Sequence, residues 1–186
     1  IQPHLTRLSS LGIYPLTRAD EDYPEKYRQR LKDSAPAVLF YAGEKALLGQ
    51  PGIGVVGSRH LDEAGQDCAK FVGNACGLSG QVLYSGGARG VGRNRLIYCL
   101  ADYAIVVASD AETGGTWAGA SETLKNNWVP VFVLEHDHMP EGNKLLLQKG
   151  ALAFPHPFKE PPVKLPDWMK EQAASLPPQT AQPTLF

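Results

Sequence analysis

Short apolar runs alternate with helix-like segments from Gly52 onward, and this alternation limits the fold more than any other feature of the chain. We expect strands at Ile53–Val56, Val82–Tyr84, Tyr103–Val107, Val129–Leu134 and Leu152–Phe154. Helices are expected at Asp62–Leu78, Arg93–Ala101, Thr116–Lys125 and Glu141–Lys149. Short, continuous, β-branched runs are typical of strands that are covered on both faces. The sequence therefore predicts an α/β fold, a Rossmann-like open and mainly parallel sheet with helices on both faces.

The flanking segments divide the chain into three expected parts. Residues 1–50 should form an N-terminal collar with one short strand, Ala37–Tyr41, and a charged helix, Lys26–Lys32. Residues 51–158 should form the Rossmann-like domain. Residues 159–186 are rich in proline and predict a tail, in which Asp167–Leu176 can dock as a short helix.

Composition excludes several classes of protein. The net charge of −1 gives no global attraction for nucleic acid, so a polyanion would need a local basic patch. No apolar run reaches the about 18 residues of a membrane span, and we expect a cytoplasmic protein without membrane contact. Cys68, Cys76 and Cys99 lie among apolar residues and should be free, buried thiols of a reducing compartment. We expect no cofactor and no metal.

A glycine-rich turn after the second strand of the alternation is the first candidate site. Glycines leave backbone N–H groups uncovered, and a helix start adds its dipole, so such turns bind anions. The arginines add guanidinium groups that suit phosphate oxygens. The candidate phosphate-binding residues here are Ser85, Gly86, Gly87, Ala88, Arg89, Gly90, Arg93, Asn94 and Arg95. A tight turn with solvated arginines is the alternative.

Two further strand-to-helix turns should lie at the same edge of the sheet, the carboxyl ends of the strands. Gly57, Ser58 and Arg59 make the first, and Gly114, Gly115 and Thr116 make the other, with Thr116 as the expected N-cap. No acidic residue lies between Asp67 and Asp102, so this edge is expected to be locally basic. We interpret the three turns as one site, with plain turn chemistry as the alternative.

Other candidates have simpler explanations. Ser58 and Ser85 can be nucleophiles but suit turn hydroxyls better, and no catalytic arrangement can be assigned from spacing. Trp117 can stack on a base or pack in the core. The Glu135–His138 loop has metal-binding side chains, yet such residues in a loop are usually solvated.

Several motifs in order resemble the DNA-processing protein A family (DprA, also called Smf). The motifs are Asp22–Pro24, Pro36–Gly43, Val55–Arg59, Ser85–Val91, Arg93–Ile97 and Gly142–Leu146, followed by Gly150–Ala151. The resemblance implies an extended Rossmann fold that binds single-stranded DNA without catalysis. It implies a role in DNA uptake and recombination, in which the protein loads the recombinase RecA, often as a homodimer. It also implies that Gly57, Ser58 and Arg59 hold the DNA backbone phosphate, and it places Ser85–Gly90 and Arg93–Arg95 at the DNA groove. The third turn, Thr113–Thr116, differs from the usual family pattern.

The chain departs from the family pattern after Val91. There an Asp and some fifty further residues, roughly a βαβ unit, normally precede the Arg-Asn-Arg signature, whereas here Gly92-Arg93 follows directly. Either the chain is a truncated relative or a segment is missing between Val91 and Gly92. An intact peptide bond of about 1.33 Å at this point would distinguish the two.

The loops also resemble the lysine-decarboxylase-like phosphoribohydrolases. That family has a glutamate three residues after its glycine-rich threonine, where this chain has Gly119, and the nearest acid is Glu122. A hydrolase without its general acid–base group would lose much of its rate. A nucleotide-hydrolysing enzyme is therefore the alternative function, and a nucleotide-sensing module is a third.

The last five residues, Gln182–Phe186, resemble the peptide that binds the bacterial sliding clamp. A Leu185–Phe186 pair on a flexible tail can anchor in a hydrophobic groove, and Gln182 can add a directional hydrogen bond. A clamp contact through Gln182, Leu185 and Phe186 is therefore an additional expectation.

Overall fold

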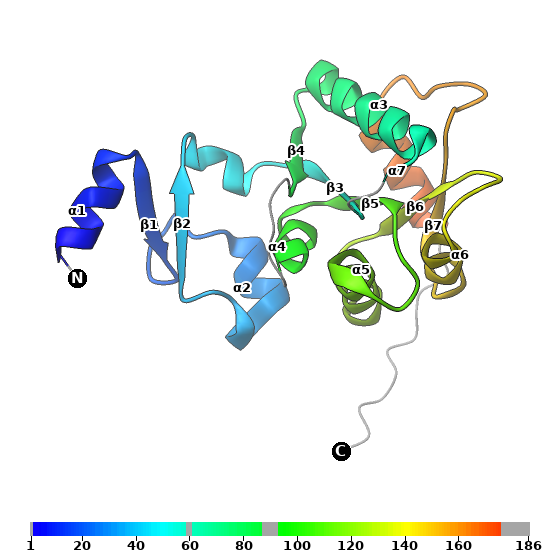
Figure 1. The fold of residues 1–186 in the computed structure, drawn as a ribbon. Helices are drawn as coiled ribbons and strands as arrows, with labels where there is room; N and C mark the ends of the chain where they lie inside the picture. The colour runs from blue at the N-terminus through cyan, green and yellow to red at the C-terminus, as the bar shows by residue number, and fades with distance from the viewer. Residues whose placement is uncertain (1, 59–60, 87–92, 176–186) are drawn as a thin grey trace.

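The computed structural model of the chain describes residues 2–58, 61–86 and 93–175, and it is built around a five-stranded sheet (Figure 1). The strands are β3 (Gly52–Gly57), β4 (Val82–Ser85), β5 (Tyr103–Ala108), β6 (Val131–Glu135) and β7 (Leu152–Pro155). They lie in the order β4-β3-β5-β6-β7, and all neighbouring strands are parallel. The helices between and after them are α3 (Glu63–Ser79), α4 (Arg93–Leu100), α5 (Gly114–Asn126), α6 (Glu141–Gln148) and α7 (Leu165–Ala174).

Alternate side chains of the strands enter two hydrophobic cores, one on each face of the sheet. Ile105 and Val107 of β5 belong to the core that α3 and α7 cover. Ala104 and Val106 belong to the opposite core, which α4, α5 and α6 cover. Both cores are closed to solvent, which is why the strands read as continuous apolar runs in the sequence. The predicted fold class, a parallel Rossmann-like sheet with helices on both faces, is confirmed.

The N-terminal part of the chain folds beside this sheet around a second, two-stranded sheet, and its Tyr23, Tyr27 and Leu31 share a buried core with α4. It contains α1 (Gln2–Ser10), β1 (Ile13–Thr17), α2 (Glu25–Leu31), η1 (Lys32–Ser34), β2 (Val38–Ala42) and η2 (Lys45–Gly49). Strands β1 and β2 pair antiparallel, with Pro15 opposite Phe40. The sequence predicts a single strand here and does not reveal β1 or α1, because a proline in a five-residue run argues against a strand. Proline is tolerated on edge strands, and β1 is an edge strand of its two-stranded sheet.

Cationic side chains of α2 attach this N-terminal unit to the end of α4. Arg30 Nη1 donates to the carbonyls of Cys99 (2.8 Å) and Ala101 (2.6 Å). Lys26 Nζ donates to Leu100 O at 2.9 Å and lies 2.8 Å from Asp102 Oδ1. The last carbonyls of a helix have no partner within it and carry partial negative charge, so cations stabilise them. The collar is thereby joined to α4 by polar contacts.

Helix α7 and an aromatic cluster close the α3 face of the sheet. Met169 is fully buried, and the Trp168 ring lies 5.7 Å from Phe132 and 5.6 Å from Phe154, between ring centroids. The short helix expected within residues 159–186 therefore packs on the core. The division of the chain at residues 50 and 158 stays a prediction.

The three cysteines are free and buried, as predicted. Burial raises the pKa of the Cys68 and Cys99 thiols to about 12, so both remain protonated and unreactive at neutral pH. Among the helices that the structure describes, none has the length and apolar character to cross a bilayer.

Replacing Arg30 tests the attachment of the collar. Arg30→Met keeps much of the apolar stem but removes both bonds to the carbonyls of Cys99 and Ala101. We expect the free energy of unfolding, measured by urea denaturation, to fall by about 2 kcal/mol. Lys70→Met on the exposed face of α3 is the matched control. Equal stability of the two variants would contradict the attachment.

Candidate nucleic-acid interface

The chain reverses its direction of travel across the sheet at β3. From β3 it moves outward to β4, and it then returns to β5 on the other side of β3. Helix α3 therefore follows β3 over one face, while α5 follows β5 over the opposite face (Figure 1). Loops that part in this way leave a crevice at the carboxyl ends of the strands, where open α/β sheets bind ligands.

The first predicted turn lies at this crevice. Ser58 N donates to Ala108 O at 2.8 Å, so the backbone stays paired up to the point where the loops part. Asp62 then caps α3, with its Oδ1 accepting from Gly65 N at 2.8 Å. The N-terminus of this 17-residue helix thus faces the edge, with the carboxylates of Asp62 and Glu63 already at the positive end of its dipole. Arg59 lies outside the described residues.

Gly57 has a packing reason that the sequence does not reveal. A Cβ at this position would lie 2.6 Å from Cγ2 of Val107 and 3.0 Å from Cδ2 of Leu61. Glycine therefore allows β3 and β5 to approach closely, whether or not a ligand is bound. A loss of binding in Gly57→Ala would therefore not separate an effect on strand packing from an effect on ligand binding.

The second turn begins on the neighbouring strand, with Ser85 paired to Val55 of β3. Ser85 Oγ donates to Val55 O at 3.0 Å, so this hydroxyl is used as a link between strands, and Gly86 after it is exposed. Gly87, Ala88, Arg89 and Gly90 lie outside the described residues. The same is true of Val91 and Gly92, so the question of a missing segment between them stays open.

Helix α4 begins at Arg93, and the next two residues take different directions. Asn94 is half-buried against α5, where its side chain contacts the positions of Gly115 and Gly119. Arg95 faces the collar: its Nη2 donates to Ser34 Oγ at 2.7 Å, and its Nε lies 3.3 Å from Glu122 Oε1. The guanidinium of Arg95 is thus already engaged on the outer side of α4. The side chain of Arg93 lies outside the described part.

The third turn precedes α5 and is acidic at its start. Asp110 and Glu112 are exposed, and Glu112 adopts φ of 54°, a left-handed value that costs energy for a residue other than glycine. The predicted N-cap, Thr116, is wrong: the cap is Thr113, because Gly114 and Gly115 join the first turn. Thr116 therefore lies inside the helix and is buried.

Asn143 is a buried residue whose role at this edge the sequence did not reveal. Its Oδ1 accepts from Ser109 N at 2.8 Å, and its Nδ2 donates to Leu134 O at 3.0 Å and to Val107 O at 3.4 Å. One amide of α6 thus joins the ends of β5 and β6. The preceding Gly142 lets α6 approach, because a Cβ there would lie 2.2 Å from Ser109 O.

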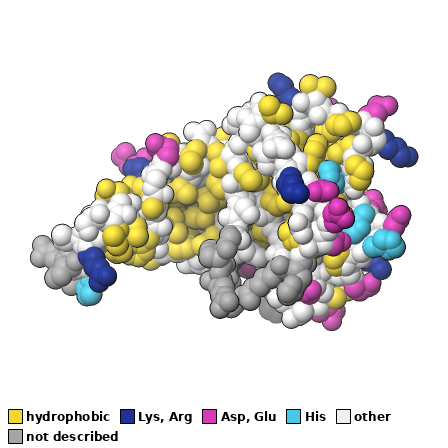
Figure 2. All heavy atoms as spheres, turned by 45° about the horizontal axis from the view of Figure 1, so that its top comes forward, with side chains coloured by type: hydrophobic (Ala, Val, Ile, Leu, Met, Phe, Trp, Pro, Cys, Tyr) yellow, Lys and Arg dark blue, Asp and Glu magenta, His cyan; other side chains and the backbone are white. Residues whose placement is uncertain are grey.

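The loop after β6 reaches across to the start of α3. His136 Nε2 lies 3.5 Å from Asp62 Oδ2, although the two atoms do not form a well-aligned hydrogen bond. In the part of the chain that the structure describes, no three His, Cys, Asp or Glu side chains are grouped as metal ligands would be. Figure 2 shows acidic and histidine side chains gathered at the end of the molecule away from the N-terminal unit.

The Trp117 side chain packs against the core and is not exposed at the carboxyl edge of the sheet as a free stacking surface. Its ring is half-buried against the α4–α5–α6 core, with Lys149 Nζ 5.5 Å from the ring centroid. Glu122, the nearest acid for the enzyme alternative, pairs with Arg95 beside the collar.

Comparisons with known proteins agree with this architecture. Residues 15–93 match the family model of DNA recombination-mediator protein A. The solved structure of DNA processing protein A (DprA) from Streptococcus pneumoniae is similar, with a TM-score of 0.61 and 17% identity over 80% of this chain and 74% of that one. DNA processing protein A from Helicobacter pylori, described for its single-stranded DNA binding mode, has a TM-score of 0.64 and 18% identity over 87% and 96%. No curated protein sequence matches the chain.

The fold thus defines a Rossmann-like α/β protein with a crevice at the carboxyl edge of its sheet. The family model that matches residues 15–93, DNA recombination-mediator protein A, is that of the DprA/Smf family that the sequence motifs resemble. The resemblance to this family that the sequence motifs predict is therefore confirmed.

Asn143 provides a test of how this edge is held. Asn143→Ala would leave Ser109 N, Leu134 O and Val107 O without their side-chain partner in a buried place. We expect a loss of about 3 kcal/mol in the free energy of unfolding, measured by urea denaturation. Asn74→Ala on the exposed surface of α3 should change stability little, and a similar small change in Asn143→Ala would refute the role.

Proposed function

We propose that this protein binds single-stranded DNA at the carboxyl edge of its sheet, without catalysis. The observation that carries the proposal is the reversal of strand order at β3, which brings the helix start of α3 and the turn after β4 to the carboxyl edge of the sheet. The match of residues 15–93 to the recombination-mediator family supports it. So does the single-stranded DNA binding for which the H. pylori relative is described.

Charge places the proposed DNA path on one side of the crevice. Arg59, Arg89 and Arg93 all belong to the segments that follow β3 and β4. Asp110 and Glu112 follow β5. A phosphate backbone is attracted by the first group and repelled by the second. We therefore propose that the strand runs over the turns after β3 and β4 and along the start of α4.

The wider role that we propose is DNA uptake and recombination in the cytoplasm, with loading of RecA onto the bound strand. A homodimer and a sliding-clamp contact through Gln182, Leu185 and Phe186 belong to the same proposal. The three tail residues lie outside the described part of the chain, so the clamp contact rests on their sequence alone.

Nucleotide hydrolysis fits the structure less well. The position at which the hydrolase family has its glutamate is Gly119, and a Cβ there would lie 2.8 Å from the Tyr98 ring. Tyr98 is fully buried between α4 and α5, so the ring cannot make room. The nearest acid, Glu122, is paired with Arg95 on the outer side of these helices. These contacts favour binding over hydrolysis.

Substitution of the edge arginines tests the binding proposal. Arg59→Ala and Arg89→Ala should each weaken binding of a labelled single-stranded oligonucleotide by about tenfold, whatever its base sequence, because each removes a charged group that pairs with phosphate. The slope of log K against log salt should become shallower by about 0.7 for each phosphate that the variant no longer neutralises. Fluorescence anisotropy at several salt concentrations measures both quantities.

Lys125→Ala, at the far end of α5, is the matched control and should bind as the wild type does. If both arginine variants bind the oligonucleotide as tightly as the wild type, the proposed interface is wrong.

Hydrolysis is tested directly by incubating the protein with nucleoside monophosphates. We expect no release of free base or inorganic phosphate, and no difference between the wild type and Glu122→Gln, since Glu122 is already paired with Arg95. Chromatography of the products measures release. Turnover in the wild type that disappears in Glu122→Gln would favour the enzyme instead.

A further inference from the structure

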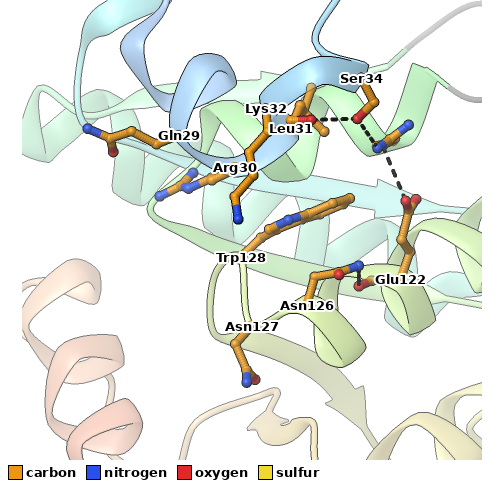
Figure 3. Close-up of a pocket in the computed structure, with 10 residues that line it drawn as sticks. Gln29, Arg30, Leu31, Lys32, Ser34, Glu122, Asn126, Asn127 and Trp128 are labelled. Carbon is orange, nitrogen blue, oxygen red and sulfur yellow. Dashed lines mark hydrogen bonds and ion pairs between the residues drawn. The ribbon is translucent and has the colours of Figure 1, made fainter. Parts of the chain in front are cut away.

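A pocket of about 430 Å³ lies outside the crevice, between the collar and the outer side of α4 and α5 (Figure 3). Its floor is Trp128, just after α5, and its opposite wall is formed by the end of α2 and by η1. We call it the Trp128 pocket. Its volume is within the range of small-molecule sites in proteins.

One aromatic ring and one guanidinium form the centre of this pocket. Trp128 is half-buried, and the Arg95 guanidinium carbon lies 5.3 Å from the centroid of its ring. Ser34 Oγ and Glu122 hold the guanidinium in place. Arg95 Nε is buried and, although it lies 3.3 Å from Glu122 Oε1, makes no well-formed hydrogen bond. Ring and guanidinium together make a fixed surface on which a flat aromatic group can stack.

The rest of the lining provides positive charge and hydrogen-bonding amides. Arg30, Lys32 and Arg95 oppose the single carboxylate of Glu122, so the formal charge of the lining is 3 − 1 = +2. Figure 3 shows the Lys32 side chain extending toward Trp128. Lys32 has φ of 49°, an uncommon value for a residue other than glycine, and this conformation sets the direction of its side chain. Asn126 and Asn127 add exposed amides at the rim.

These features suit a ligand with a planar heteroaromatic group and an anionic group. The ring of Trp128 can stack on the planar group, the amides can bond to its edge, and the positive charge attracts the anion. We propose that the Trp128 pocket binds one nucleotide, with the base stacked on Trp128 and the phosphate near Lys32. The nucleotide belongs either to a DNA strand or to a free mononucleotide pool.

The test uses two probes, deoxyadenosine monophosphate and a labelled 20-residue oligodeoxyadenylate, with binding measured by calorimetry and anisotropy. Trp128→Leu should weaken binding of the relevant probe by about tenfold, because the base can no longer stack. Lys32→Gln should weaken it by about threefold, because the variant removes one positive charge. Phe40→Leu and Lys70→Gln, an exposed aromatic and an exposed lysine elsewhere, are the matched controls and should leave binding unchanged.

The two sources give different patterns, and both support the site. If the pocket takes a unit of the strand, both variants weaken oligonucleotide binding and the mononucleotide competes with it. If it takes a free nucleotide, the variants weaken only mononucleotide binding, and Arg59→Ala leaves that binding intact even if the crevice proposal fails. Unchanged affinity of both variants for both probes, or no wild-type binding of either, overturns the proposal. Circular dichroism shows whether each variant is folded. If Trp128→Leu does not fold, the binding result for Lys32→Gln alone decides whether the pocket binds a nucleotide.

Discussion

The reversal of the chain at β3 is the constraint on which the candidate interface depends. Helices α3 and α5 must cover opposite faces of the sheet, so the loops that lead into them part above two strands that are still paired. The bond from Ser58 N to Ala108 O marks the last paired position. This topology places the candidate binding site at the carboxyl edge between β3 and β5 before any particular side chain is considered.

The elements around the crevice are held by contacts made some distance from it. Asn143 joins the ends of β5 and β6, which holds the backbone of Ser109 on one side. On the other side, Lys26 and Arg30 of the collar cap the end of α4, whose first residue is Arg93 at the edge. The collar therefore also braces α4, the helix that begins at Arg93.

Sequence patterns predicted the sheet well because its strands are buried on both faces and its helices begin at glycine turns. Predicted and observed elements from Gly52 to Phe154 differ mainly at their ends, as at Val129, where the strand begins only at Val131. The pattern failed at β1, where Pro15 argued against a strand. It also failed at Thr116, because Gly114 and Gly115 enter the helix despite their low propensity.

The long-range part of the site could not be found from the sequence. The partners of Asn143 lie 9 to 36 residues away, and those of Arg30 lie 69 and 71 residues away. No local spacing reports such contacts. The same holds for Arg95, which the motif assigned to the DNA edge and which the structure places against Ser34, Glu122 and Trp128.

Photo-cross-linking shows most directly where single-stranded DNA lies on this protein. An oligonucleotide that carries 4-thiothymidine can be bound, irradiated and mapped by mass spectrometry of the cross-linked peptides. We expect cross-links in residues 57–62 and 85–95, at the carboxyl edge beside β3 and β4. Cross-links confined to the α3–α7 face or to the β1–β2 sheet would contradict the proposed interface.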